Sequence, residues 1–393
     1  MAAGPQEWLM TIIATESNED IKAQLTKFSG LHERKLWHQL TVALLEFIHT
    51  ENSYGDKQLA LYENFIQSFE SKMNQLSLVQ IIVRISKTIP DAKNFLQDAL
   101  SRQVAREAAA NIATITPDIP QARVFCECET ASMRLRTGDH QYAKEVIESS
   151  EKFLETSLGV EALVFSSHYR LQLEYHKALM VPEGYYKNSL LYLAYTPLES
   201  ISREDQEFLA FDLCLAALVG ETIYTFGDLL AHKILGCLEG GEKAWIVHLL
   251  RAFSSGNINK YKELVEQHKE VLNQQPLLVK NVQLLLQKIS ILSLIELIFQ
   301  RSLADRTIPF SIIGEATKLP IDQVELLLMK SLSLGLIKGT IDQVDQTVFI
   351  RWVQPRILEL DQVTSLRDRL GEWSKSVNDT LIYLEGETQE IVV

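Results

Sequence analysis

One stretch of this chain, residues 307–353, constrains its fold more than any other. The residue pattern predicts a helix over 311–318, a turn at Leu319-Pro320 and a second helix over 321–334. Two runs rich in β-branched and aromatic residues follow, 336–341 and 348–353, and they predict a β-hairpin. Two helices, a tight turn and a hairpin, in this order, are typical of a winged helix. Such a module binds nucleic acid or another protein module. The residues of its second helix indicate which of these two functions applies.

The charges of the second predicted helix favour a protein partner. This helix carries Asp322 and Glu325 against a single basic residue, Lys330. A helix that reads DNA needs lysine and arginine to neutralise phosphates. Its apolar residues recur at helical spacing and predict a face packed on a core: Ile321, Val324, Leu328 and Leu332. The sequence therefore predicts no nucleic-acid binding.

Composition supports that prediction and places the chain in a broad class. The 393 residues include 51 acidic and 38 basic side chains, a net charge of −13, which gives no general attraction to nucleic acid or to an anionic membrane. The four cysteines are too few for a disulfide framework, and free thiols favour a reducing compartment. The N-terminal segment has no basic residue before its short apolar run, so no signal peptide is expected. We expect a protein of the cytoplasm and nucleus.

Nearly every segment before the winged helix predicts an α-helix. Residues 133–143 and 250–261 form a weak repeat, in which a helix ends at a glycine turn and a second helix carrying a tyrosine follows. This pattern is typical of tetratricopeptide-like (TPR-like) helical hairpins, although two unrelated helix turns would give the same signal. A long, mostly apolar helix is predicted over 277–303. Its run 284–299 is interrupted by Gln287, Lys288 and Glu296, which predicts a buried helix rather than a membrane span.

The C-terminal helix has a different pattern. Apolar residues alternate spacings of three and four, as in the a and d positions of a heptad repeat: Val363, Leu366, Leu370, Trp373, Val377, Thr380 and Leu384. Such a seam packs lengthwise on another helix. Two interpretations remain open, which are docking on the helical hairpins of the same chain and a bundle with partner chains.

The sequence contains no motif of a catalytic site. Residues 236–243 approach a phosphate-binding loop, but Glu242 stands where that motif requires lysine. Cys126-Glu127-Cys128 is a single C-x-C without a second pair, so no structural zinc is expected. We predict a protein that is not an enzyme and that uses no cofactor or metal.

Several segments resemble the PCI-domain subunits of the proteasome lid. They are residues 33–41 and 61–66 near the N-terminus, and 333–344 and 352–356 in the winged helix, and the likeness spans nearly the whole chain. The resemblance implies a mainly α fold: a TPR-like helical-hairpin solenoid over 1–185, a PCI domain over 186–355 with its winged helix at about 305–355, and a long C-terminal helix over 356–393.

The same resemblance implies a non-catalytic scaffold of the 26S proteasome lid that supports assembly and ubiquitin-dependent degradation. Its expected partners are other PCI subunits at the edge of the winged-helix sheet, the lid's C-terminal helical bundle, and the neighbouring deubiquitinase module and ubiquitin receptor, with no nucleic acid and no membrane. The expected interface residues are Val348, Ile350, Trp352, Val363, Leu366, Leu370, Trp373, Val377 and Leu384. The alternatives are a PCI subunit of the COP9 signalosome or of initiation factor three, and a winged-helix nucleic-acid-binding protein.

Overall fold

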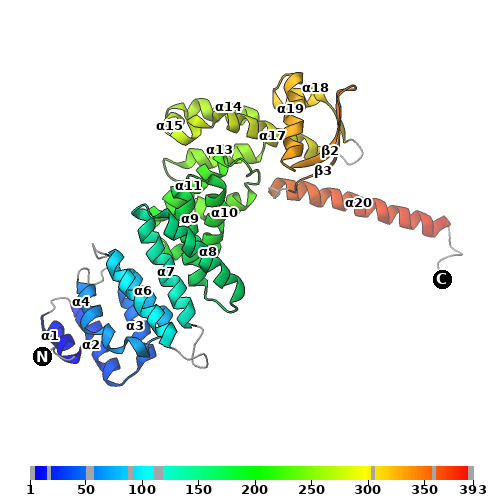
Figure 1. Ribbon diagram of the computed structural model, residues 1–393. Helices are drawn as coiled ribbons and strands as arrows, with labels where there is room; N and C mark the ends of the chain where they lie inside the picture. Colours follow the sequence, from blue (N-terminus) through cyan, green and yellow to red (C-terminus); the bar gives the residue numbers. More distant parts are fainter. Residues whose placement is uncertain are drawn as a thin grey trace. The chain divides into compact units, whose positions relative to one another are not determined.

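The chain forms two compact units, Met1–Ile201 and Ser202–Val393. They are seen in a computed structural model that describes residues 5–15, 19–49, 57–86, 92–109, 118–301, 306–355 and 360–387. Both units are built mainly from α-helices, and a small sheet lies near the C-terminus (Figure 1), which confirms the predicted fold class. The predicted boundary after residue 185 differs from the observed one. It would fall inside helix α10 (Pro182–Tyr195), which packs along α9 (Ala162–Ala178).

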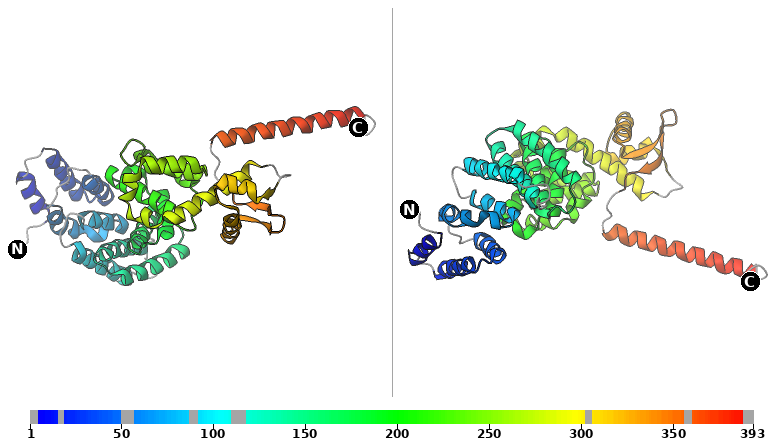
Figure 2. Two further views of the ribbon diagram at one scale, coloured as in Figure 1. Left: turned by 90° about the horizontal axis from the view of Figure 1, so that it is seen from above. Right: turned by 60° about the horizontal axis from the view of Figure 1, so that its bottom comes forward.

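The first unit is a series of packed helices around one continuous apolar core. Figure 2 shows these helices, coloured blue to green, from two further directions. In addition to α9 and α10 it contains α1 (Pro5–Thr15), α2 (Glu19–Glu33), α3 (Trp37–His49), α4 (Lys57–Asn64), η1 (Ile66–Lys72), α5 (Gln75–Ser86), α6 (Ala92–Ala109), α7 (Asp118–Arg136), α8 (His140–Thr156) and η2 (Leu198–Ser200). Neighbouring helices along the chain pack on one another, as expected for helical hairpins.

Both turns of the predicted repeat are present. Between α7 and α8, Gly138 adopts a φ of 93°, and the side chain of Asp139 caps α8 by accepting a hydrogen bond from the backbone N–H of Tyr142. In the second unit, Gly256 (φ 62°) and the capping residue Asn257 do the same between α13 (Ala244–Ser254) and α14 (Ile258–Gln267). The two predicted helix–turn–helix units are therefore confirmed.

The two glycines differ in what surrounds them. A Cβ atom at Gly138 would meet nothing within 4 Å, whereas one at Gly256 would lie 2.9 Å from the carbonyl oxygen of Leu292. Leu292 belongs to α17 (Val282–Gln300), so the turn after α13 packs directly on the backbone of that helix. Only glycine permits both this close approach and the positive φ.

The second unit contains further helices and, after them in the chain, the winged helix. Its remaining helical elements are α11 (Arg203–Val219), α12 (Gly227–Ala231), η3 (Lys233–Cys237), α15 (Lys269–Asn273) and α16 (Pro276–Lys280). The long helix predicted over 277–303 is divided at Asn281 into α16 and α17, and its predicted end at 303 lies outside the described residues.

Helix α17 is long and apolar enough to cross a membrane by length and composition alone. Half of its most apolar window is buried inside the chain, where it contacts α13, α14, α18 (Phe310–Thr317) and α19 (Ile321–Ser333). Its apolar side chains therefore pack in a protein core, as the interrupted apolar run predicts.

The winged helix contains a strand that the sequence pattern does not reveal. Its sheet has the order β1-β3-β2, formed by β1 (Thr307–Pro309), β2 (Ile337–Asp342) and β3 (Thr347–Val353), all antiparallel. Ile308 of β1 is fully buried opposite Val348 of β3. The inner face of the sheet packs with α17, α18 and α19 around one apolar core. The addition of β1 places β3 in the middle of the sheet.

The chain ends in α20 (Leu360–Glu387), a single continuous helix of 28 residues, drawn in red in Figure 2. It includes every position of the predicted heptad seam. The ends of the predicted C-terminal segment, residues 356–359 and 388–393, lie outside the described residues.

Candidate interaction surfaces

The strand order changes which hairpin residues a partner can reach. Val348 and Ile350 are fully buried in the winged-helix core, and the backbone N–H of Ile350 donates a hydrogen bond to the carbonyl of Arg306. At these positions β3 is paired on both sides, so neither residue lies at an open edge. The hairpin alone predicts an open edge here, and the additional strand β1 covers it. Of the three predicted hairpin residues, only Trp352 is exposed, by 39%.

The open edge of the sheet is β2. Within the described residues, β2 is paired on one side only, with β3. The opposite edge, β1, has three residues and ends in Pro309, which lacks a backbone donor. A bulge at Lys338/Gly339 brings the backbone of β3 so close that a Cβ atom at Gly339 would lie 2.3 Å from the carbonyl oxygen of Phe349. An unpaired strand of this kind can extend the sheet of a neighbour through backbone hydrogen bonds.

Aromatic side chains lie beside this edge. The Lys338 ammonium lies 4.9 Å from the centre of the Trp352 ring, within cation–π range, and Phe349 on β3 is 43% exposed. A half-exposed tryptophan held by a lysine offers a large apolar contact at low cost in conformational entropy. Trp352 therefore remains a candidate contact residue.

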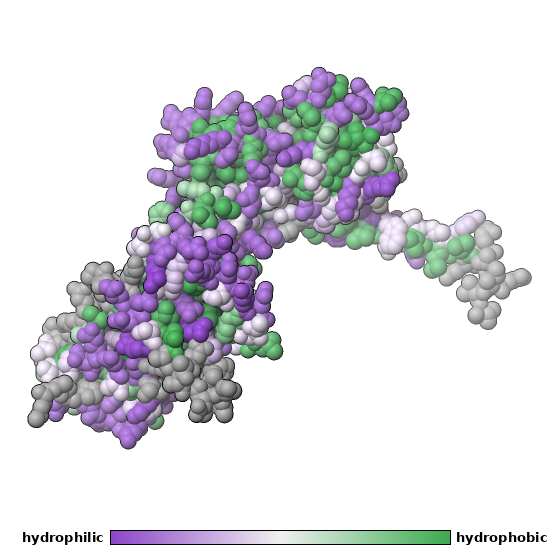
Figure 3. All heavy atoms as spheres, in the orientation of Figure 1, coloured by the Kyte–Doolittle hydropathy of each residue, from purple (hydrophilic) through white to green (hydrophobic). Residues whose placement is uncertain are grey.

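The seam of α20 is open along its whole length. Its six apolar residues named above, from Val363 to Leu384, are 46% to 68% exposed. Three further apolar residues that the heptad pattern did not select, Leu381, Ile382 and Tyr383, are 52% to 66% exposed. Figure 3 shows hydrophobic residues on the surface of this helix. A solvent-exposed helix with such a seam is typical of one whose partner helices come from elsewhere.

A buried lysine in the second unit forms hydrogen bonds with the end of a neighbouring helix. Lys288 of α17 is 1% exposed, and its Nζ donates to the carbonyl oxygens of Ala217, Leu218 and Gly220 at 2.7, 3.2 and 2.8 Å. These oxygens lie at the C-terminal end of α11, where the helix dipole favours a positive charge. Lys288 therefore links α17 to α11 through three hydrogen bonds.

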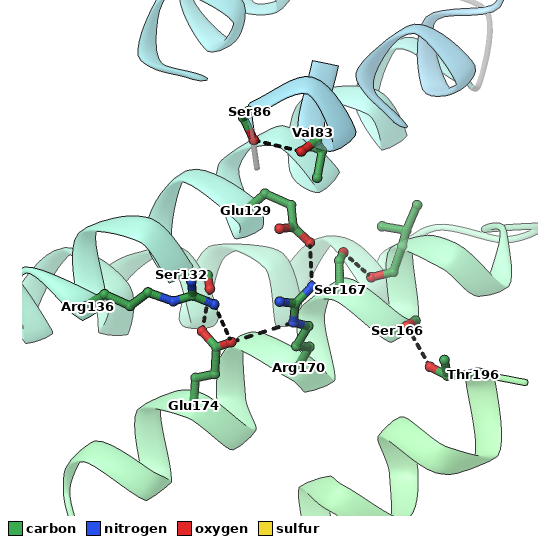
Figure 4. A network of polar contacts seen from close by, with 11 residues as sticks. Val83, Ser86, Glu129, Ser132, Arg136, Ser166, Ser167, Arg170, Glu174 and Thr196 are labelled. Atoms are coloured by element: carbon green, nitrogen blue, oxygen red, sulfur yellow. Dashed lines mark hydrogen bonds and ion pairs between the residues drawn. The ribbon is translucent and has the colours of Figure 1, made fainter. Parts of the chain in front are cut away.

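Polar groups join α7 and α9 in the first unit, as Figure 4 shows. Arg170 lies 3.8 Å from a carboxylate oxygen of Glu129 and 3.5 Å from one of Glu174. Arg136 lies 3.5 Å from Glu174, which also accepts a hydrogen bond from Ser132. Each charge in this group has an opposite charge beside it, so the network holds α7 and α9 together.

Among the described residues of the first unit, His168 on α9 is the most enclosed histidine, 2% exposed. Its Nε2 lies 3.0 Å from the amide nitrogen of Gln172, which donates to it, and its Nδ1 lies 2.8 Å from the Ser150 hydroxyl. The Ser150 hydroxyl donates in turn to the carbonyl of Val146, so it accepts from His168. These bonds assign a neutral ring with its proton on Nδ1. Burial lowers the pKa of His168 from its ordinary value of 6.5 to about 4.

The low pKa of His168 predicts acid destabilisation of the first unit. Above pH 6.5 the ring is neutral in the folded and the unfolded chain, and its contribution to stability is fully present. Between pH 6.5 and about 4 the unfolded chain binds a proton that the folded chain excludes, which removes about 3 kcal/mol of the free energy of unfolding. Hydrogen exchange of α8 and α9 across this range measures the loss. His168→Leu should flatten the pH dependence, and an unchanged slope in that variant would exclude this origin.

The described residues contain no group of three or more His, Cys, Asp or Glu side chains that could hold a metal ion. Cys126 and Cys214 are buried, and burial raises the pKa of each thiol to about 12. Burial also raises the pKa of Cys128. Protonated, enclosed thiols are poor nucleophiles.

Known proteins are similar to this chain over most of its length. The family model of PSD13 N-terminal repeats matches residues 24–250, and that of the PCI domain matches residues 265–352. The 26S proteasome non-ATPase regulatory subunit 13 homolog B of Arabidopsis thaliana is 41% identical over 368 residues, which cover 93% of each chain. The 26S proteasome regulatory subunit RPN9 of Saccharomyces cerevisiae is 32% identical over 390 residues, 98% of each chain.

A more distant likeness covers part of the chain. Eukaryotic translation initiation factor 3 subunit M of Nematostella vectensis is 28% identical over 195 residues, 49% of this chain and 46% of that protein. The matches to proteasome subunits extend over both units, and the two family models agree with the helical repeats and the winged helix. The chain belongs to the family of 26S proteasome non-ATPase regulatory subunit 13, whose members combine N-terminal repeats with a PCI domain.

Proposed function

We propose that this protein is a non-catalytic scaffold subunit of the 26S proteasome lid, which supports assembly of the regulatory particle and ubiquitin-dependent protein degradation. One observation carries the proposal: α20, a helix of 28 residues, exposes an apolar seam from Val363 to Leu384. A helix of this composition gains stability mainly by packing against other helices. Similarity to proteasome regulatory subunits over more than nine-tenths of the chain supports the lid as the source of those helices.

The winged helix supplies the second contact of the proposal. The open edge of β2 pairs with the sheet of one neighbouring PCI subunit, and Trp352 packs against that neighbour. Edge pairing provides backbone hydrogen bonds, and the exposed aromatic side chain provides specificity. The chain then positions the neighbouring deubiquitinase module and the ubiquitin receptor without a reaction of its own. Its place of action is the cytoplasm and nucleus.

The two rival complexes receive less support. The likeness to initiation factor 3 subunit M covers about half of each chain, whereas the likeness to proteasome subunits covers more than nine-tenths. Membership in the subunit 13 family favours the proteasome over the COP9 signalosome. Nucleic-acid binding lacks the basic helix that it needs.

Replacement of Trp352 with alanine tests the edge contact. We expect Trp352→Ala to reduce crosslinking between the hairpin and one neighbouring lid subunit by about thirtyfold, because truncation of a hot-spot tryptophan costs about 2 kcal/mol. Phe208→Ala, at a side chain that is 61% exposed on α11, is the matched control. Crosslinking mass spectrometry on purified lid gives the readout. Equal crosslinking in both variants would remove Trp352 from the interface.

A further inference from the structure

A separate surface of the winged helix has an unusual combination of groups. It consists of the outer side of α19 and the β2–β3 turn, and we refer to it as the α19–wing surface. Four apolar side chains on it are 46% to 94% exposed: Ile321, Leu326, Met329 and Val344. Figure 3 shows hydrophobic residues among hydrophilic ones over this part of the chain. Helical spacing placed Ile321 on the face packed on the core, but the structure exposes 46% of it, and the same pattern assigned no face to Leu326 and Met329.

The two parts of this surface are held together. The side-chain amide of Gln343, in the turn, donates a hydrogen bond of 3.1 Å to the Glu325 carboxylate on α19. The Asp342 carboxylate fixes the turn itself by accepting from the backbone N–H groups of Val344 and Asp345, at 3.0 and 3.2 Å. The hydrogen bond from Gln343 to α19 and the hydrogen bond from the Val344 backbone to Asp342 therefore fix the position of Val344 relative to α19.

The charge around the apolar side chains has one dominant sign. Asp322 and Glu325 lie on the same helical stripe as Leu326 and Met329, since these positions are three and four residues apart. Asp342 and Asp345 add two carboxylates in the turn, and Lys330 is the one basic residue of α19. A partner that covers this surface must supply apolar side chains and positive charge together.

We propose that the α19–wing surface binds a basic amphipathic helix of a partner protein. The apolar side of that helix covers Leu326, Met329 and Val344, and its lysine or arginine residues face the four carboxylates. In a winged helix that reads DNA, the equivalent helix and wing carry basic residues for phosphates. Here the same geometry has acidic and apolar chemistry, so it selects a cationic protein segment and repels a nucleic acid. Apart from Asp342, the last residue of β2, this site is separate from the β2 edge, and it does not include α20.

The test uses the full-length chain and a fluorescein-labelled peptide of leucine and lysine at helical spacing, measured by fluorescence anisotropy. We expect binding that weakens with added salt, and hydrogen exchange should show protection of α19 and of residues 342–346. Leu326→Ser/Met329→Ser should lower the affinity by about tenfold or more. Leu158→Ser, at a side chain that is 98% exposed in the first unit, is the control and should leave the affinity unchanged.

A charge exchange sharpens the test. Asp322→Lys/Asp345→Lys should lose the leucine–lysine peptide and gain binding of a leucine–glutamate peptide, which the unmodified chain should not bind. This gain cannot come from misfolding. Three results would each overturn the proposal: equal affinity for the Leu326→Ser/Met329→Ser variant, protection confined to α20, or tighter binding of duplex DNA than of the basic peptide.

Discussion

Leu370→Asp and Trp373→Asp are each expected to exclude this protein from the proteasome lid while leaving the isolated chain folded. Both side chains are more than half exposed on α20, so the isolated chain loses no internal packing. In a helical bundle the new carboxylate would be buried without a partner, at a cost of about 3–5 kcal/mol. This corresponds to a loss of affinity of more than about a hundredfold. Co-purification of lid subunits with the tagged variant measures the effect, and circular dichroism confirms the fold.

The matched control for these variants lies on the same helix. Lys375 occupies the side of α20 opposite the heptad seam, and its replacement by aspartate introduces the same side chain away from the predicted contact. Lys375→Asp should co-purify with lid subunits like the unmodified chain. If Leu370→Asp and Trp373→Asp did the same, α20 would have no role in the bundle.

Lys288→Met is expected to lower the free energy of unfolding of the second unit by about 3 kcal/mol or more. Methionine matches the length of lysine, but three buried carbonyl oxygens at the end of α11 lose their charged donor. A buried polar group without a partner costs about 1–3 kcal/mol. Urea unfolding, followed by hydrogen exchange of α11 and α17, gives the measurement.

Lys280→Met is the control, because Lys280 is an exposed lysine on α16 in the same unit. Its substitution should leave the unfolding midpoint within experimental error. An equal midpoint for Lys288→Met would show that the contacts of Lys288 with α11 contribute nothing to stability. A selective loss of α11 and α17 protection in Lys288→Met would place the effect at the joint between these helices.

Helical periodicity predicted the fold class because it depends on local spacing. The stripe of Ile321, Val324, Leu328 and Leu332 predicted α19, and the alternating spacing after Val363 predicted α20. The glycine turns were also predictable, since Gly138 and Gly256 each precede a residue that caps the next helix. In each case the structural cause lies within a few residues of the chain.

Features that depend on residues distant in the sequence could not be predicted. β1 has three residues, too few to show alternation, and only its pairing with β3 makes it a strand. Its pairing covers the edge of β3 at Val348 and leaves β2 as the open edge. The buried contact of Lys288 could not be predicted either. Lys288 is a single lysine in an apolar helix, and the carbonyl groups that it bonds lie about 70 residues earlier.

The candidate contact residues also divide into those that local sequence predicts and those that depend on distant residues. The seam of α20 was predictable because a heptad repeat is a property of one helix. The α19–wing surface was not, because it combines a helix face with the tip of a turn, joined by Gln343 and Glu325. Exposure of Leu326, Met329 and Val344 is known only once the core on the other side of α19 is known.

Native mass spectrometry of the complex purified through a tag on this protein tests the central claim most directly. The account predicts one copy of this chain together with the other PCI subunits and the deubiquitinase of the proteasome lid. It also predicts that this assembly is lost with Leu370→Asp and kept with Lys375→Asp. Recovery of this chain alone, or with the subunits of the signalosome or of initiation factor three, would contradict the account.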